Sequence, residues 1–417
     1  MTQSTPPIAI DPDYVERLIM ELASFGAYGG TGVWRPVYTP EWVASADCFA
    51  GWCNGAKLEV DRDAVGNVWG RLRGSELGPS IVSGSHLDTQ LPGGRYDGAL
   101  GAIAAFVAVK ALKEQFGQPR RTLEAVALCE EEGSRFPTAG FWGSRAVIGR
   151  IAPNDAYTTI GRDGETIADA MRLAGLDPAR IPEAKRSDIE IFIELHIEQG
   201  PILEQADLAV AVVDAITSIR HTEYVLTGVA NHAGAFPMDL RNDAMAGFAE
   251  IASGVINTAH RMGRPTVTTV GRVAVDPNGA AIIPRAVTFT VDARHPNPAK
   301  AEALYKLHDD LIREVAARRG LTVESRILFN HRACPSDPTL VQMLRQVAGD
   351  QGVMTLTMSS GAGHDTQQMA KAVKRVAMIF VRSKDGRSHT PEEFSSVPDI
   401  VAGIKVLTAG LYSLAYD

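Results

Sequence analysis

The sequence predicts an α/β protein in which a mostly parallel sheet with helices on both faces is interrupted by a smaller α+β domain. Strand-like and helix-like segments alternate through the first half of the chain, which is typical of β-α-β units. From about residue 213 the order becomes strand, helix, two strands, helix and strand, and alternation returns from about residue 332. We therefore expect one domain of residues 1–212 and 332–417, and an inserted domain of residues 213–331.

Short apolar runs that end in polar residues predict the main sheet. Residues 81–83, 122–129 and 189–195 have the length and apolar content of buried strands. Residues 98–116 are apolar and rich in alanine, with charged side chains only late in the run, and they predict a mostly buried helix. The last clear strand is expected at residues 373–381.

The inserted domain shows its own pattern of elements. Asn242 is a candidate N-cap for the first of its helices. The helices are expected at residues 242–261 and 298–319. The strands are expected at residues 224–229, 266–275, 286–293 and 321–329. This order resembles a compact α+β sandwich.

Composition excludes several classes of protein. The chain has 417 residues and a net charge of −8, and a mildly acidic protein is a poor candidate for binding nucleic acid or an anionic membrane. Four cysteines without a CxxC pair predict neither a disulfide framework nor a cysteine zinc site. The longest apolar run, residues 98–109, is too short for a membrane span, and the N-terminus has no signal-peptide pattern. We expect a cytoplasmic protein.

Residues that could bind metal follow the predicted strands. His86 and Asp88 follow the first strand, the glutamates 130–132 follow the second, and His196 follows the third. His389 comes a few residues after the last strand. Ligands fixed at the ends of sheet strands are held by a rigid scaffold. Asp88 could orient the ring of His86 or support a neighbouring group.

Each of these signals also has a simpler interpretation. His86 could be a polar strand end, and Asp97, which starts a helix, could be its N-cap. A charge run is usually solvated, but three successive glutamates after a buried strand need a cation or raised pKa values. Taken together, nitrogen and oxygen ligands without cysteine suit Zn²⁺, Mn²⁺ or Co²⁺.

Seven strings between about residues 84 and 393 resemble one family. They are GSHLDT, GGRYDGALG, EEEGSRF, ELHIEQGP, NHAGAFPMDLRNDA, SGAGHD and SHTPEE. The family comprises metal-dependent amidohydrolases and includes N-carbamoyl-L-amino acid hydrolases, β-ureidopropionases of the bacterial and yeast type, and allantoate amidohydrolases. It is the hydantoinase/carbamoylase branch of the M20 peptidase group. The resemblance implies that the first domain is a metal-binding catalytic domain and the inserted one a lid and dimerisation domain.

The resemblance also implies two divalent metal ions, Zn²⁺ or one of Mn²⁺, Co²⁺ and Ni²⁺, with Asp97 shared between them. The implied ligands are His86, Asp97 and His196 for one ion, and Asp97, Glu132 and His389 for the other. Glu131 abuts the ligand Glu132 and would be the general base. His232 would stabilise the oxyanion, while Gln199 and Arg294 would bind the substrate.

Two stretches depart from the family pattern. Ala281 stands where the family has a substrate-contacting asparagine, and Ala235-Phe236 stand where it usually has two threonines. The metal set is intact while the substrate set has lost polar contacts, and a lost polar partner costs about 1–3 kcal/mol of recognition. The reaction class is therefore better defined than the substrate.

The expected activity is hydrolysis of a linear amide or ureido C–N bond by metal-activated water, with N-carbamoyl amino acids or allantoate-type compounds as substrates. One alternative is an aminoacylase or dipeptidase of the wider group, although His196 argues against it because that branch is associated with a carboxylate ligand at this position. Another is a ligand-binding protein without activity. As partners we expect a small amide or ureido substrate, no nucleic acid, no membrane, and a second copy of the chain in a homodimer.

Overall fold

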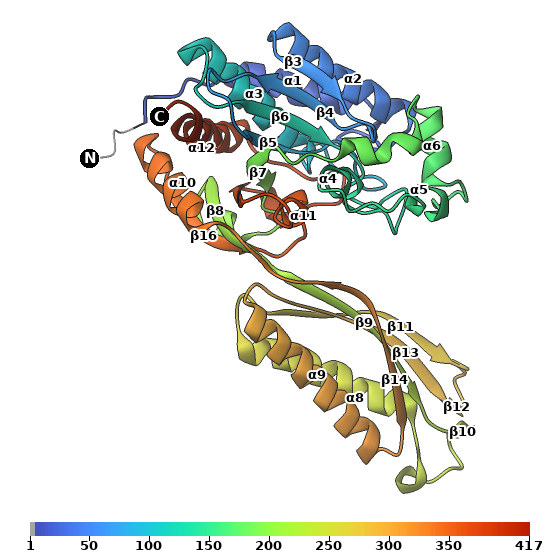
Figure 1. The fold of residues 1–417 in the computed structure, drawn as a ribbon. Coiled ribbons are helices and arrows are strands. Elements are labelled where there is room, and N and C mark those ends of the chain that lie inside the picture. Colours follow the sequence, from blue (N-terminus) through green and yellow to red (C-terminus); the bar gives the residue numbers. More distant parts are fainter. Residues whose placement is uncertain (1–4) are drawn as a thin grey trace. The chain divides into compact units, whose positions relative to one another are not determined.

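The computed structural model describes residues 5–417 and divides them into two compact units. The first unit contains the residues up to 214 together with 336–358 and 364–417, and the second contains residues 215–335 and 359–363. Figure 1 shows the elements of each unit. The second unit is thus an insertion that also takes in a short segment from much later in the chain.

A mixed sheet forms the centre of the first unit (Figure 1). Its core strands β6, β5, β7 and β17 run parallel, whereas β4 and β8 flank them antiparallel, on β6 and β17 respectively. The strands are β3 (Glu59–Arg62), β4 (Val68–Leu72), β5 (Ser80–His86), β6 (Leu123–Leu128), β7 (Ile189–Ile197), β8 (Val210–Ile216), β16 (Thr355–Ser360) and β17 (Arg375–Val381). The prediction of a mostly parallel sheet is confirmed, with antiparallel flanks that were not foreseen.

Helices cover both faces of this sheet. Leu195 of β7 packs against Gly403 of α12, whereas its neighbour Glu194 accepts hydrogen bonds from Thr366 of α11. Successive side chains of a strand point to opposite faces, so α12 and α11 lie on opposite sides. The helices are α1 (Pro12–Ser24), α2 (Pro40–Gly55), α3 (Ala99–Phe116), α4 (Trp142–Val147), α5 (Asp155–Thr158), α6 (Ile167–Leu173), α7 (Ile202–Ala206), α10 (Pro338–Asp350), α11 (Asp365–Met369) and α12 (Val397–Ala415).

Helix α3 begins next to the C-terminal ends of β5 and β7. Its N-cap is Gly98, with φ 62°, and no side chain caps it, so Asp97 is not the N-cap. A Cβ on Gly101 would lie 2.2 Å from the carbonyl oxygen of Leu195, so glycine lets the helix approach β7 closely. The first turns of α3 are buried throughout, as the apolar run predicts.

Helix α12 is the one described helix that is long and apolar enough to cross a membrane, by length and composition only. Of the most apolar stretch of this helix, 61% is buried inside the structure. The helix packs against α3, α10 and β17. Buried core helices can be equally long and apolar. The packing of α12 against these elements accounts for its apolar character.

The second unit is an antiparallel sheet in the order β11-β13-β9-β14 with two helices packed on it. Its elements are β9 (Ser218–Thr227), β10 (Asn231–His232), α8 (Ala244–Met262), β11 (Val267–Asp276), β12 (Ile282–Ile283), β13 (Ala286–His295), α9 (Pro298–Arg318), β14 (Thr322–His331) and β15 (Cys334–Pro335). Asp243, not Asn242, caps α8, because its side chain accepts from the N–H groups of Met245 and Ala246. The carbonyl of Asn242 instead accepts from Val229.

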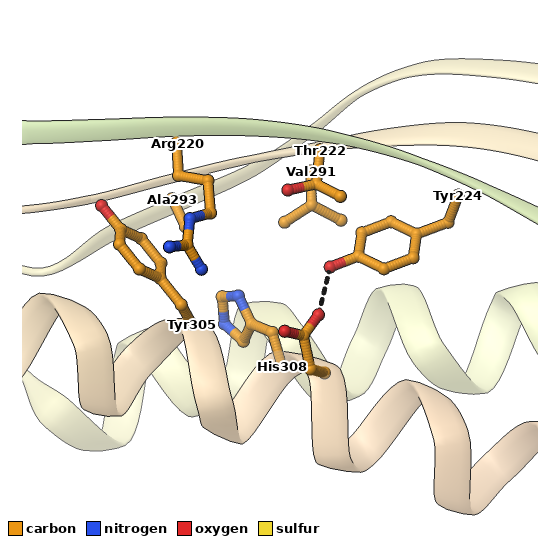
Figure 2. A pocket seen from close by; sticks show the side chains of 8 residues that line it. Arg220, Thr222, Tyr224, Val291, Ala293, Tyr305 and His308 are labelled. Carbon is orange, nitrogen blue, oxygen red and sulfur yellow. Dashed lines mark hydrogen bonds between the residues drawn. The ribbon is translucent and has the colours of Figure 1, made fainter. Parts of the chain in front are cut away.

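A small cavity with both polar and apolar lining lies between α9 and the sheet of the second unit (Figure 2). His308 is 2% exposed, and its Nε2 has no hydrogen-bond partner among the residues described. Tyr224 donates to Asp309 across the cavity, over 2.7 Å. Burial lowers the pKa of His308 to about 4, so this ring is neutral at neutral pH.

Candidate metal centre

The C-terminal ends of the parallel strands bring the predicted metal ligands together. His86 ends β5, His196 lies near the end of β7, and Glu132 follows β6. Asp97 precedes α3, and His389 follows β17. Two groups of side chains each have ligand atoms within 4.8 Å of one another, and both groups include Asp97.

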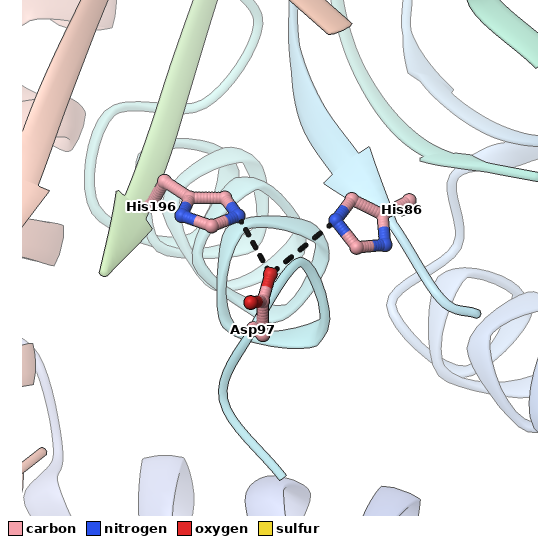
Figure 3. Close-up of side chains that lie close together, drawn as sticks. All are labelled: His86, Asp97 and His196. Atoms are coloured by element: carbon pink, nitrogen blue, oxygen red, sulfur yellow. Dashed lines mark ion pairs between the residues drawn. The ribbon is translucent and has the colours of Figure 1, made fainter. Parts of the chain in front are cut away.

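The first group is His86, Asp97 and His196, all buried (Figure 3). Oδ1 of Asp97 lies 3.5 Å from Nε2 of His86 and 3.1 Å from Nε2 of His196. The two imidazoles thus reach toward the same carboxylate oxygen from neighbouring strands.

The second group is Asp97, Glu132 and His389. Nε2 of His389 lies 3.4 Å from Oδ2 of Asp97 and 3.6 Å from Oε2 of Glu132. The Asp97 carboxylate therefore turns one oxygen to each group, which is the arrangement that a shared ligand needs.

Backbone contacts set the tautomers of the two buried histidines. Nδ1 of His86 lies 3.0 Å from the carbonyl oxygen of Asp88, and Nδ1 of His196 lies 2.9 Å from that of Ile197. A carbonyl oxygen only accepts, so each Nδ1 donates and each Nε2 is the ring nitrogen left for other partners. Each Nε2 faces Asp97, which is the nitrogen that would bind a metal ion.

Asp88 supports the glutamate loop. Its carboxylate accepts hydrogen bonds from the backbone N–H groups of Glu131, over 3.2 Å, and Glu132, over 3.1 Å. The closest approach of this carboxylate to the His86 ring is 3.7 Å. Of the two roles that the sequence left open for Asp88, the geometry favours support of a neighbouring group.

The electrostatics of the cluster fit divalent cations. Burial raises the pKa values of Glu131 and Glu132 well above their usual range. Burial would also raise the pKa of Asp97, but His196 and His86 hold it well below its usual range. Oε1 of Glu132 is buried without a hydrogen-bond partner in residues 5–417. An unpartnered carboxylate oxygen beside imidazole nitrogens is a set of potential ligand atoms that suits Zn²⁺, Mn²⁺ or Co²⁺.

The three glutamates of the run have different surroundings. Glu130 has φ 46°, and its Oε1 accepts from the N–H of Phe136 over 2.9 Å. Oε2 of Glu131 lies 3.7 Å from Nε2 of His86. Gln90 donates to Oε2 of Glu132 over 2.7 Å. Glu130 is thus engaged in shaping its own loop, while its two successors face the metal ligands.

A buried cluster of one glutamate and two histidines adjoins the first group. The sequence analysis does not predict this cluster. Glu194, His196 and His364 form a third set whose ligand atoms lie close together. Glu194 already accepts hydrogen bonds from Ser85 and Thr366, so its oxygens are occupied. The ring of His364 stacks edge-on against His196, with centroids 4.6 Å apart. The strings ELHIEQGP and SGAGHD contain these residues but do not show that they meet.

The three predicted substrate-binding residues belong to two different units. Gln199 donates to Oδ2 of Asp97 over 2.7 Å, within the metal cluster. His232 and Arg294 belong to the second unit. Nδ1 of His232 accepts from the N–H groups of Gly234 and Ala235.

Arg294 already has a carboxylate partner. Its Nε and Nη2 pair with Asp292, the closest distance being 2.7 Å, and its Nη1 donates to the carbonyl of Gly361 over 2.7 Å. Each Nη nitrogen carries two hydrogens, so these bonds leave N–H groups on the guanidinium for a further partner.

Comparisons with known proteins agree with this geometry. Residues 83–412 match the model of peptidase family M20/M25/M40. Allantoate amidohydrolase of Escherichia coli is 38% identical, covering 97% of this chain and 98% of that protein. N-carbamoyl-L-amino-acid amidohydrolase of Paenarthrobacter aurescens is 37% identical, covering 94% of this chain and 95% of that protein.

A solved structure extends the likeness to the fold. It is an amidase of the hydantoinase/carbamoylase family from Burkholderia multivorans, 31% identical, with a TM-score of 0.91 and coverage of 99% of this chain and 100% of that one. The chain therefore belongs to peptidase family M20/M25/M40, in its hydantoinase/carbamoylase branch, and is an amidohydrolase that acts on non-peptide C–N bonds.

Proposed function

We propose that this amidohydrolase hydrolyses the ureido C–N bond of small substrates of the N-carbamoyl amino acid or allantoate type at a pair of divalent metal ions. The observation that carries the proposal is Asp97, whose two oxygens face two separate ligand groups. The relatives from Escherichia coli and Paenarthrobacter aurescens, named for these activities, support the substrate class.

The proposed ligands are His86, Asp97 and His196 for one ion and Asp97, Glu132 and His389 for the other. Such ions polarise a substrate carbonyl and lower the pKa of water to near neutrality. Zn²⁺, Mn²⁺, Co²⁺ and Ni²⁺ are the candidates for these ligands.

Glu131 is the proposed general base. Burial raises the pKa of its carboxyl, which favours proton uptake near neutral pH. It would take a proton from the attacking water and return it to the departing nitrogen. Asp88 accepts the backbone N–H of Glu131, so the backbone that carries the proposed base is anchored.

The second unit is proposed to act as lid and dimerisation domain and to supply His232 and Arg294. Because Nδ1 of His232 accepts backbone N–H groups, the ring hydrogen lies on Nε2, and the exposed ring can donate to an oxyanion. Arg294 would grip a substrate carboxylate with its remaining N–H groups. Gln199 is proposed to contact substrate from the first unit.

The proposal is tested by ammonia and CO₂ release after reconstitution with each candidate metal. The panel holds N-carbamoyl-L-amino acids, N-carbamoyl-β-alanine and allantoate, with N-acyl amino acids as controls. Release of both products from a ureido compound is expected. Activity on an N-acyl control with no ureido turnover would contradict the proposal and favour an aminoacylase, and full metal binding without turnover of any compound would favour a binding protein.

A further inference from the structure

A buried carboxylate outside the predicted ligand set holds the loop that carries Asp97. Glu393 is 3% exposed, and its Oε1 accepts from the backbone N–H groups of Tyr96, over 2.9 Å, and Asp97, over 2.8 Å. Burying a carboxylate costs free energy unless hydrogen bonds satisfy it. The two backbone donors supply that compensation, and they tie the loop to Glu393.

The hydroxyl of Ser388 lies between the other oxygen of Glu393 and the side chain of Asp97, and its one hydrogen serves one of these acceptors at a time. Oγ of Ser388 lies 3.1 Å from Oε2 of Glu393 and 2.6 Å from Oδ2 of Asp97. Asp97 is thus held at its backbone by Glu393 and at its carboxylate by Ser388. These contacts limit rotation of the carboxylate as well as movement of the loop.

The surrounding residues are arranged to admit Glu393. A Cβ on Gly94 would lie 2.4 Å from Oε1 of Glu393, so the absence of a side chain there allows the carboxylate to approach. Phe394 packs edge-on against Tyr96, with ring centroids 6.0 Å apart. Thr31 also donates to the carbonyl of Pro391 over 2.6 Å. Segment 388–394, which includes His389, is therefore anchored against the Asp97 loop.

We propose that Glu393 is a positioning residue for metal binding, which holds Asp97 and the segment of His389 in the arrangement that faces both ligand groups. The inference rests on the proposed function, because it requires the metal site. Oδ1 of Asp97 faces His196 at 3.1 Å, and Oδ2 faces His389 at 3.4 Å. Without Glu393, the loop and the segment lose the contact that sets these directions together.

The test compares Glu393→Ala and Glu393→Gln with Glu392→Ala, which removes the exposed neighbouring carboxylate. Chelator-treated protein is titrated with Mn²⁺ and with Zn²⁺, and bound metal per chain is measured without substrate, with near-UV circular dichroism as the check of folding. Glu393→Ala is expected to weaken metal binding about 10–100-fold. Glu393→Gln keeps an oxygen for the two N–H groups and is expected to lose less, and Glu392→Ala is expected to match the wild type.

Metal binding by Glu393→Ala as tight as that of Glu392→Ala would overturn the proposal. If Glu393→Ala does not fold, Glu393→Gln decides: weaker metal binding than that of Glu392→Ala supports the proposal, and binding as tight as that of Glu392→Ala overturns it. A wild-type protein that binds metal but releases no ammonia from ureido compounds contradicts the proposed function alone, since the role of Glu393 is measured by metal binding.

Discussion

At the scale of single residues, chemistry-bearing side chains can be located from the sequence, but their partners cannot. His86, Glu132 and His196 follow apolar runs, so their place at the sheet edge is predictable. Nothing in the sequence shows that Asp88 binds the N–H groups of Glu131 and Glu132, or that Glu393 binds the Asp97 loop. Such contacts join segments distant in the chain and depend on the tertiary fold.

Replacing Glu131 by glutamine tests the general base. Glu131→Gln keeps the shape of the side chain but cannot take up a proton, so we expect turnover to fall about 10²–10⁴-fold while metal binding stays near the wild-type value. Ammonia release and metal content measure the two effects. The control is Glu130→Gln, in which an amide oxygen still accepts from Phe136. Near-full activity of Glu131→Gln would rule out this base.

Asp88 offers a second test, at the backbone of the same loop. Asp88→Asn replaces one acceptor oxygen with a donor that faces an N–H of Glu131 or Glu132, so the loop must shift. We expect turnover to fall about 10–100-fold, as for other partners that orient metal ligands. Steady-state kinetics at saturating metal measure the effect. Wild-type kinetics would show that the Asp88 contact does not matter for catalysis.

At the scale of elements, hydrophobic periodicity predicts the centre of the fold better than its edges. The parallel strands β5, β6 and β7 are apolar runs with helices between them, and this pattern can be recognised from the sequence. The antiparallel strand β4 joins β3 by a short connection and has no such separating helix. The sequence predicts Asn242 as the cap of α8, but Asp243 caps it, because propensity does not distinguish adjacent residues of similar capping preference.

Alanine substitutions at the two glycines that flank α3 distinguish the effect of backbone strain from the effect of damage to the metal site. Gly98 and Gly117 both have positive φ, but a Cβ on Gly98 would lie 2.3 Å from the ring of His86, whereas one on Gly117 meets nothing within 4 Å. Both alanine variants should lose about 1–3 kcal/mol of stability from backbone strain, and Gly98→Ala should lose more because its Cβ also meets His86. Only Gly98→Ala should also lose metal affinity, which metal titration and thermal unfolding measure. Equal metal affinity in the two variants would contradict this reading of the site.

His308 predicts acid sensitivity of the second unit. Its pKa is about 4 in the folded chain against an ordinary 6.5, so between these pH values the unfolded state binds a proton that the folded state does not. The contribution of neutral His308 to the free energy of unfolding is therefore complete above pH 6.5 and is lost as the pH falls toward 4. The loss amounts to about 3 kcal/mol at most.

Thermal unfolding at pH 7 and pH 4.5 checks this effect. His308→Gln should lose less stability on acidification than the wild type, while His260→Gln, at an exposed position of α8, should behave like the wild type. The same acid loss in all of these proteins would mean that His308 is not the group responsible.

At the scale of the whole molecule, the inserted unit is expected to mediate dimerisation. Its edge strand β14 exposes Ile327 (54%) and Leu328 (45%), and exposed apolar residues on a sheet edge favour pairing with another chain. Analytical ultracentrifugation should give about twice the chain mass of 44.7 kDa, and Ile327→Lys should shift the protein toward monomer. A wild-type monomer at micromolar concentration would contradict the expectation.

The most direct test of the central claim is a metal titration of chelator-treated protein, followed by ammonia release from allantoate and N-carbamoyl-L-amino acids. If the groups that share Asp97 hold two catalytic ions, activity on a ureido compound should be absent at first and rise to its maximum as two equivalents bind per chain. Full ureido hydrolysis by the metal-free protein would contradict the account.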